Sequence, residues 1–193
     1  MAPKLILTGF MATGKSAVGR AVAARLGWPL RDSDAELVAR AGKPIPAIFA
    51  EHGEAYFRAL EREVIAALAD DPARCAQCGQ PRPAVISTGG GALVDERNCL
   101  ALKRAGVIVC LTARIEVIAA RVRRAPHKRP KLLEGGKPLR ARIDELLEER
   151  RAAYARADYT VDTSDLSVAE SAERVLEIFS RHGGRRHRCT PSA

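Results

Sequence analysis

Residues 9–16, Gly-Phe-Met-Ala-Thr-Gly-Lys-Ser, are the part of the chain whose types and spacing most clearly indicate chemistry. They fit G-x-x-x-x-G-K-[ST], a loop whose backbone N–H groups surround nucleotide phosphates. In such a loop Lys15 would reach the β- and γ-phosphates, and the Ser16 hydroxyl would bind Mg²⁺. The alternative is an ordinary strand–turn–helix joint, but the motif arises by chance in only about one chain of this length in a hundred. We therefore predict a nucleotide-phosphate site formed by Ala12, Thr13, Gly14, Lys15, Ser16 and Ala17.

Two carboxylates, Asp32 and Asp34, follow a short apolar stretch. Beside a phosphate loop, one carboxylate could hold Mg²⁺ through its water ligands, and the other could bind a substrate hydroxyl. The alternative is that Ser33 or Asp34 only caps the helix that follows. A position at the end of a predicted strand favours a role in the site, although capping and substrate contact can coexist.

Two further patterns are less specific. Arg58 and Glu61 lie one turn apart on a predicted helix, and their spacing alone does not exclude a surface ion pair. Gly89, Gly90 and Gly91 come directly after a predicted strand. Three glycines at this place reduce stability, and the usual reason is close approach of a ligand to the main chain.

The rest of the chain provides the elements that must position these residues. Its pattern alternates between strand and helix, which is typical of an α/β fold with a parallel sheet. Strands are predicted at 4–8, 29–31, 84–87, 107–111 and 159–162, and helices at 17–26, 35–40, 45–51, 55–68, 95–104, 115–124, 139–157 and 168–180. Right-handed crossovers then bring residues 9–16, 32–34 and 88–91 to one edge of the sheet. We expect one three-layer αβα domain over residues 1–180, with a five-stranded parallel sheet.

Composition excludes several classes of function. The 193 residues are 47% hydrophobic and 28% charged, as in a soluble globular domain. No apolar run reaches membrane-spanning length, and the phosphate loop begins too early for a signal peptide, so we expect a cytoplasmic protein without a membrane partner. Much of the net charge of +9 lies in residues 181–193, a tail with four arginines and no acid that we expect to be disordered. Aromatic residues make up only 4%, and no nucleic-acid motif appears, so nucleic acid is not an expected partner.

Five cysteines include one Cys-x-x-Cys pair, Cys75 and Cys78. A structural zinc site needs four ligands, and no second pair follows. We interpret the pair as part of a polar surface insertion over residues 72–83.

Together, these motifs resemble those of the shikimate kinase family. That family combines the phosphate loop, an Asp-x-Asp, a Gly-Glu-x-x-Phe-Arg-x-x-Glu helix, a triple glycine, an Arg-Pro lid and an Arg-x-x-x-Tyr. The chain carries them in the same order between about Leu5 and Phe179, as Gly9–Ser16, Asp32 and Asp34, Gly53–Glu61, Gly89–Gly91, Arg129 and Pro130, and Arg150 and Tyr154.

The resemblance implies a P-loop kinase fold and Mg²⁺-dependent transfer of the ATP γ-phosphoryl group to the 3-hydroxyl of shikimate by a monomer. Lys15, Asp34 and Arg129 would then be the catalytic residues. Asp34 would bind the reacting hydroxyl and act as its base. Arg129 would reach the phosphates with a mobile lid at about 125–138.

The same resemblance implies the binding residues. Arg58 and Arg150 would hold the shikimate carboxylate, and the backbone of residues 89–91 would hold the ring. Asp32 would hold Mg²⁺ through water, alongside Ser16. Arg121 or Arg123 would pack on adenine, with Arg121 as the expected ATP ligand.

The chain also departs from the family pattern. Ala12 stands where many members have glycine, and Lys131 is an extra residue after the Arg-Pro pair. Another small-molecule kinase, such as a gluconate kinase or a nucleotide kinase, is the first alternative, and a non-catalytic nucleotide-binding module is the second. The pair Arg58 and Arg150 argues against the first alternative. The presence of Lys15, Asp34 and Arg129 together argues against the second.

Overall fold

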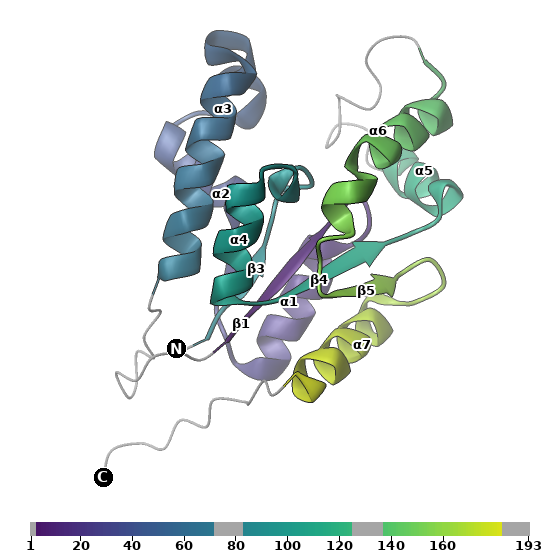
Figure 1. Cartoon of the computed structure of the whole chain (residues 1–193). Coiled ribbons are helices and arrows are strands. Elements are labelled where there is room, and N and C mark those ends of the chain that lie inside the picture. Colours follow the sequence, from purple (N-terminus) through teal and green to yellow (C-terminus); the bar gives the residue numbers. More distant parts are fainter. Residues whose placement is uncertain (1–2, 72–82, 125–136, 183–193) are drawn as a thin grey trace.

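The computed structural model describes residues 3–71, 83–124 and 137–182. In this part of the chain, five parallel strands form one sheet in the order β2-β3-β1-β4-β5 (Figure 1). The strands are β1 Lys4–Gly9, β2 Leu30–Asp32, β3 Val85–Ser87, β4 Gly106–Thr112 and β5 Tyr159–Asp162. The helices are α1 Lys15–Leu26, α2 Ser33–Ala41, α3 Ile45–Asp70, α4 Glu96–Ala105, α5 Ile115–Arg123, α6 Leu139–Tyr154 and α7 Val168–Arg181, with a 3-10 turn, η1, at Ala92–Val94. The predicted α/β fold with a five-stranded parallel sheet is confirmed.

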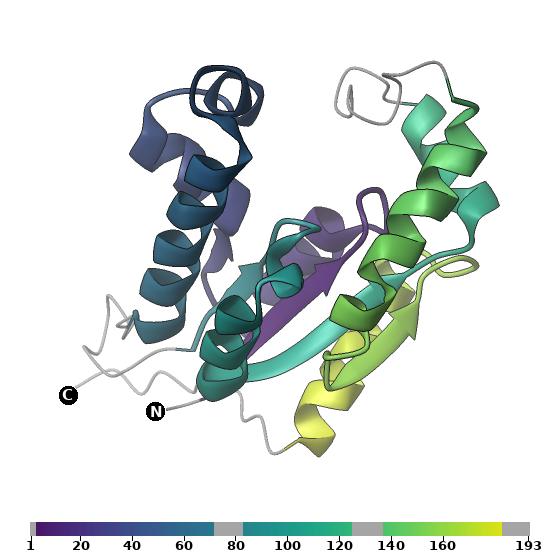
Figure 2. The same cartoon turned by 45° about the horizontal axis from the view of Figure 1, so that its top comes forward.

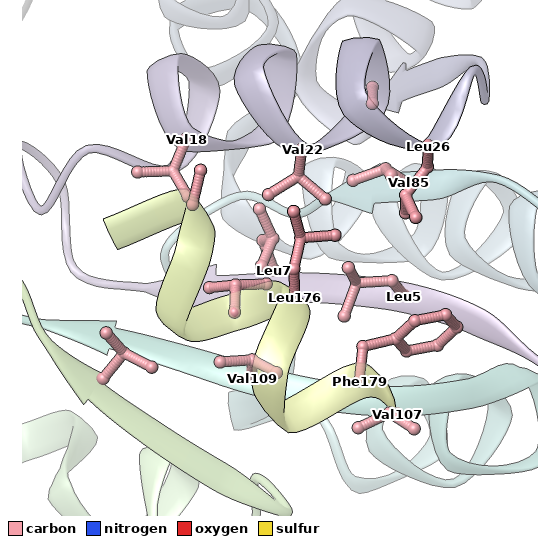
Figure 3. Close-up of a cluster of buried hydrophobic side chains, with 14 of the residues drawn as sticks. Leu5, Leu7, Val18, Val22, Leu26, Val85, Val107, Val109, Leu176 and Phe179 are labelled. Atoms are coloured by element: carbon pink, nitrogen blue, oxygen red, sulfur yellow. The ribbon is translucent and has the colours of Figure 1, made fainter. Parts of the chain in front are cut away.

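The central strand β1 explains the three layers. All six of its residues are buried, and alternate side chains of a strand face opposite sides of the sheet. Leu5 and Leu7 pack in a cluster with side chains of α1 and α7 (Figure 3). Ile6 packs on the other face, in a cluster with side chains of α3 and α4. Burial on both faces is why β1 lacks the polar alternation of a solvent-facing strand.

A third apolar cluster connects the phosphate loop to the last part of the fold. Phe10 and Ala12 of the loop pack with side chains of α5 and α6, namely Ile118, Ala119, Val122, Ile143 and Leu146. These two helices therefore hold the polar residues on their exposed sides in fixed positions relative to the loop. Arg121 of α5 and Arg150 of α6 are placed in this way.

The carboxyl ends of β1, β2 and β3 meet at one edge of the sheet, as right-handed crossovers require. Residues 9–16, 32–34 and 88–91 follow these three strands directly. Helices α2 and α3 stand on one side of this edge, and α5 and α6 stand on the other (Figures 1 and 2). The expected convergence of the three polar segments is confirmed.

Helix α3, Ile45–Asp70, agrees with the prediction of two helices at 45–51 and 55–68. It consists of two helical segments joined across a kink at Gly53, where φ is 77°, ψ is 179° and the backbone is not helical. This conformation is accessible essentially to glycine alone, so the chain changes direction there. Strand β2 differs from the prediction, because it ends one residue later and Asp32 is its last residue.

Several predictions lie outside the described residues. They include nearly all of the expected lid, the tail beyond residue 182, and the Cys75 and Cys78 insertion. Within the described ranges, Cys99 and Cys110 are buried free thiols. No helix there has the length and apolar character needed to cross a membrane.

Candidate active site

The phosphate loop connects β1 to α1, so its N–H groups lie at the amino-terminal end of a helix. Gly14 is the N-cap residue of α1 and has a φ of 104°. The Lys15 ammonium donates a hydrogen bond of 2.9 Å to the Phe10 carbonyl oxygen across the loop. A helix amino terminus and a lysine together favour an anion at this place. The geometry therefore agrees with the predicted phosphate site.

Ala12 has a φ of 65° and is the one non-glycine residue of the described ranges with a positive φ. A left-handed conformation costs an L-residue about 1 kcal/mol or more. The alanine that stands where many members of the family have glycine is therefore in a strained backbone conformation.

The start of α2 separates the roles of the two carboxylates. Asp32 is the N-cap residue, and its Oδ1 accepts hydrogen bonds from the N–H groups of Asp34 (3.0 Å) and Ala35 (3.3 Å). The alternative that Ser33 or Asp34 provides this cap is therefore wrong, because β2 extends to Asp32. The cap leaves the Asp34 side chain directed into the site.

Asp34 lies in a cavity whose walls limit its hydration, although its carboxylate meets the solvent of the open site. The pKa of Asp34 is raised to about 6, chiefly because of this partial burial. Repulsion from Asp32 and from Glu61 contributes to the rise, while attraction to Lys15 opposes it. A carboxyl group with such a pKa can exchange a proton near neutral pH, which suits a general base.

The triple glycine lies against three side chains that were predicted to bind substrate. A Cβ on Gly89 would lie 2.6 Å from Asp34 Oδ1. On Gly90 it would lie 3.4 Å from Nη1 of Arg150, and on Gly91 it would lie 3.0 Å from Nη1 of Arg58. Larger residues would push these side chains away, so the loop needs glycine because charged groups approach it closely.

Two hydroxyl groups hold the triple glycine from opposite sides. The Ser33 Oγ, at the start of α2, accepts a hydrogen bond of 2.9 Å from the Gly89 N–H. The Tyr154 hydroxyl, at the end of α6, donates a hydrogen bond of 2.7 Å to the Gly90 carbonyl oxygen. The main chain of this loop is therefore fixed by side chains that come from two distant parts of the sequence.

Arg58 makes the ion pair that its spacing suggested, but not on the outer surface. Its Nη1 donates a hydrogen bond of 2.8 Å to Glu61, whose side chain is only 4% exposed. The guanidinium group also contacts Glu54 and lies 5.3 Å from the Phe57 ring. These partners hold Arg58 at the cavity wall, where Arg150 faces the same glycine loop.

The cavity has a volume of about 810 Å³. Its polar wall is made by the phosphate loop, the carboxylates and the two arginines, and its apolar wall comes from α2 and α3, with Val38, Ile45, Pro46, Phe49 and Phe57. Phosphate-binding residues and predicted substrate residues therefore share one space. Arg129 lies outside the described residues.

The residues expected to hold Mg²⁺ fit that ion. The Ser16 and Asp32 side chains both line the cavity. Mg²⁺ takes oxygen ligands, keeps several waters and needs few protein groups beside substrate phosphates. The two backbone hydrogen bonds that Asp32 accepts at the start of α2 use Oδ1, so Oδ2 is the atom that would accept a hydrogen bond from a metal-bound water.

Arg121, the expected adenine ligand, bonds to the phosphate loop and to the segment after β5. Its guanidinium group donates hydrogen bonds to the Ala12 carbonyl and to Thr163, and it is not among the cavity-lining residues. Arg123 is exposed at the end of α5. Thr163 was missed by the sequence analysis, since one threonine after a strand gives no signal of a contact with a loop 150 residues away.

The fold and the cavity define a P-loop kinase-type protein whose acceptor site is built for a small anionic molecule. The family model for shikimate kinase matches residues 11–180. The shikimate kinase of Desulforudis audaxviator is 42% identical over 179 residues, which cover 93% of this chain and 87% of that protein. The shikimate kinase of Salinibacter ruber is 41% identical over 185 residues, which cover 92% of this chain and 84% of that protein.

A solved structure agrees with these relatives. The shikimate kinase from Acinetobacter baumannii in complex with shikimate has a TM-score of 0.82 and 30% sequence identity, and the match covers 96% of this chain and 97% of that one. The chain belongs to the shikimate kinase family. The predicted family is confirmed, and with it the prediction of a kinase that uses ATP.

Proposed function

We propose that this chain transfers the γ-phosphoryl group of ATP to the 3-hydroxyl of shikimate in the cavity between the phosphate loop and the triple glycine. The observation that carries the proposal is that Asp34, Arg150 and Arg58 each lie within 3.4 Å of the place that a Cβ on one of three adjacent glycines would occupy. One base and two guanidinium groups around one short loop suit a molecule with both a hydroxyl and a carboxylate. Shikimate is such a molecule.

The two arginines bind the substrate carboxylate in this proposal. Guanidinium groups form forked, charge-assisted hydrogen bonds with carboxylates, and two of them hold the carboxylate in one orientation. Glu61 orients Arg58, and the Phe10 ring lies 5.7 Å from the Arg150 guanidinium carbon. The arginines are thereby held in place before the substrate arrives.

Asp34 then acts as the general base. As the 3-hydroxyl oxygen bonds to the γ-phosphorus, Asp34 accepts the hydroxyl proton, and the bond to the bridging oxygen of ADP breaks. Lys15 balances the charge on the phosphate oxygens. Phosphoryl transfer depends mainly on such positioning and charge stabilisation.

Mg²⁺ bound by Ser16, and by Asp32 through water, would orient the phosphates and reduce their charge. Arg129 is proposed to supply a further cation to the transferring group. Replacement of Arg129 by alanine should therefore lower kcat more than it weakens shikimate binding. We also propose that the protein works as a cytoplasmic monomer.

The direct test is ADP release with different acceptors. Shikimate, gluconate and nucleoside monophosphates are offered in turn with ATP and Mg²⁺, and the product of the active reaction is identified by mass and by phosphorus NMR. We expect turnover with shikimate and a single product phosphorylated at the 3-position. A kcat/KM for gluconate or a nucleotide equal to that for shikimate would refute the proposal.

A further inference from the structure

The outer side of the phosphate loop has partners that neither the motif nor the family resemblance indicated. A loop that turns N–H groups towards phosphates turns carbonyl groups away from them, and these carbonyls need donors. The Ala12 carbonyl oxygen accepts a hydrogen bond of 3.2 Å from Nη1 of Arg121. The Thr13 carbonyl oxygen accepts one of 2.9 Å from the Thr163 hydroxyl.

Thr163 is the centre of this arrangement. It follows β5, it is only 2% exposed, and its Oγ1 lies 2.9 Å from the Thr13 oxygen and 3.0 Å from the Thr112 oxygen. The Thr112 oxygen already accepts the Thr163 backbone N–H at 2.9 Å. A hydroxyl group has a single proton to donate. Because the Thr112 oxygen already has a donor, we assign the Thr163 hydroxyl proton to the Thr13 carbonyl oxygen.

Arg121 completes the network. Its Nη1 donates to Thr163 Oγ1 at 3.1 Å, and its Nη2 donates to the Thr163 carbonyl at 2.7 Å. Arg121 and Thr163 are therefore bonded to each other as well as to two successive peptide groups of the loop. Groups joined in this way restrict one another's movement more than separate contacts would.

These contacts determine the direction of the phosphate-binding groups. In a trans peptide the C=O and the next N–H point in opposite directions. Holding the Ala12 carbonyl fixes the N–H of Thr13, which donates a hydrogen bond of 3.4 Å to the Phe10 carbonyl and so closes the turn of the loop. Holding the Thr13 carbonyl fixes the N–H of Gly14. The same bonds stabilise Ala12 in its strained left-handed conformation.

We propose that Thr163 and Arg121 are positioning residues that hold the phosphate loop in its anion-binding conformation. The proposal rests on the proposed function only in taking residues 9–16 as the ATP phosphate site. It gives Arg121 a role at the loop beside the expected contact with adenine. It also gives Thr163, which follows β5, a part in nucleotide binding through its bond to the loop.

The test is Thr163→Val, which replaces the hydroxyl with a methyl group of similar size. Dissociation constants are measured by calorimetry for ADP with Mg²⁺, for inorganic tripolyphosphate, and for shikimate without nucleotide. We expect ADP and tripolyphosphate to bind about tenfold or more weakly, since a buried hydrogen bond is lost. Shikimate binding should change less than twofold.

Two matched variants separate positioning from general stability. Thr163→Ser restores the hydroxyl and should bring both phosphate ligands within about twofold of the unchanged protein. Thr160→Val makes the same replacement at an exposed position of β5 and should have no effect. Equal weakening of all three ligands by Thr163→Val, or unchanged phosphate binding, would overturn the proposal.

Arg121→Met gives a second route if Thr163→Val does not fold. Loss of loop positioning should weaken the binding of tripolyphosphate as well as that of ADP, and tripolyphosphate reports on the loop alone because it has no base. Weakening of ADP alone would show that Arg121 acts only on adenine, and it would overturn its role at the loop. If the unchanged protein bound neither phosphate ligand, the proposed function itself would fail.

Discussion

Tyr154 and Gly90 are joined by a hydrogen bond of 2.7 Å from the tyrosine hydroxyl to the glycine carbonyl oxygen. Tyr154 is the last residue of α6, four residues after Arg150 on the same helix. One helix end therefore supplies both a proposed carboxylate ligand and the group that fixes the loop beside it. Burial raises the pKa of Tyr154 to about 12, so the hydroxyl keeps its proton at neutral pH.

Replacement of Tyr154 by phenylalanine should raise the KM for shikimate about fivefold to tenfold and change the KM for ATP little. The reason is that the Gly90 carbonyl loses its donor while the ring still packs. Steady-state kinetics with each substrate varied in turn measures both constants. Tyr159→Phe is the matched control, because Tyr159 is an exposed tyrosine whose hydroxyl meets His182. A larger effect on the KM for ATP than on that for shikimate would contradict this role.

Asp34→Asn should reduce kcat by about 100-fold or more and leave ATP affinity within about threefold. Asparagine keeps the shape of the side chain but cannot accept the proton of the hydroxyl. Turnover and nucleotide titration on the same preparation provide the two numbers. Asp165→Asn, at an exposed carboxylate paired with Arg114, should change neither. Near-normal turnover in Asp34→Asn would show that Asp34 is not the general base.

The pH dependence of kcat/KM for shikimate should show a loss of activity as the pH falls through about 6. Below that value Asp34 is protonated in the free enzyme and cannot accept the hydroxyl proton. The profile is recorded from about pH 5 to pH 9 at constant ionic strength. An acidic limb near the ordinary aspartate pKa of about 4 would show that the surroundings of Asp34 do not raise its pKa.

The same raised pKa has a consequence for stability. The folded protein binds a proton at Asp34 more tightly than the unfolded chain, so this residue opposes folding increasingly as the pH rises from about 4 to above 6. Asp34→Asn should therefore be more stable than the unchanged protein at pH 8, with a smaller difference at pH 4. Denaturant unfolding of both proteins at the two pH values measures this. A larger difference in the free energy of unfolding at pH 4 than at pH 8 would contradict this prediction.

Arg58→Ala and Arg150→Ala should each weaken shikimate by about 2 to 4 kcal/mol, or roughly 30-fold to 1000-fold. Lysine at either place should restore binding only in part, since an ammonium group cannot form the planar fork. The comparison that isolates the carboxylate uses the carboxamide analogue of shikimate. The unchanged protein should prefer shikimate strongly, and each alanine variant should prefer it far less.

Arg151→Ala controls for helix α6 in this experiment. Arg151 is next to Arg150, but its side chain is 77% exposed and pairs with Glu148 on the surface. Its replacement should leave the preference for shikimate unchanged. If Arg58→Ala kept the full preference, Arg58 would serve only its ion pair with Glu61.

The sequence predicted the sheet and the place of the site because those depend on local patterns. Apolar runs identified β1, β3 and β4, and the alternation of strand and helix patterns placed β2 and β5. The phosphate-loop motif located β1 and α1 together. The alternative of a helix cap was considered at Ser33 or Asp34 and not at Asp32, because the end of β2 was placed one residue early. The break at Gly53 between the two parts of α3 was predicted, because the helical pattern stops before this glycine and resumes after it.

Other features could not be predicted because they depend on contacts between distant segments. Thr163 and Arg121 acquire their role only when α5 and the end of β5 meet the loop after β1. The same holds for Tyr154, whose motif indicated a family resemblance but not a hydrogen bond to Gly90. The motifs therefore located the groups that would touch the ligands. They did not locate the groups that hold these ligand-binding groups in place.

The kink at Gly53 has a consequence for how this sequence can change under selection. No heavy atom would lie within 4 Å of a Cβ at this position, so a packing argument alone would permit any small residue. The backbone angles forbid it, because they belong to a region that only glycine enters at low cost. In a library of all single substitutions, Gly53 should tolerate few replacements although it stands in open space. Constraint of this kind would show that the direction of a helix, and not a contact, is what selection preserves there.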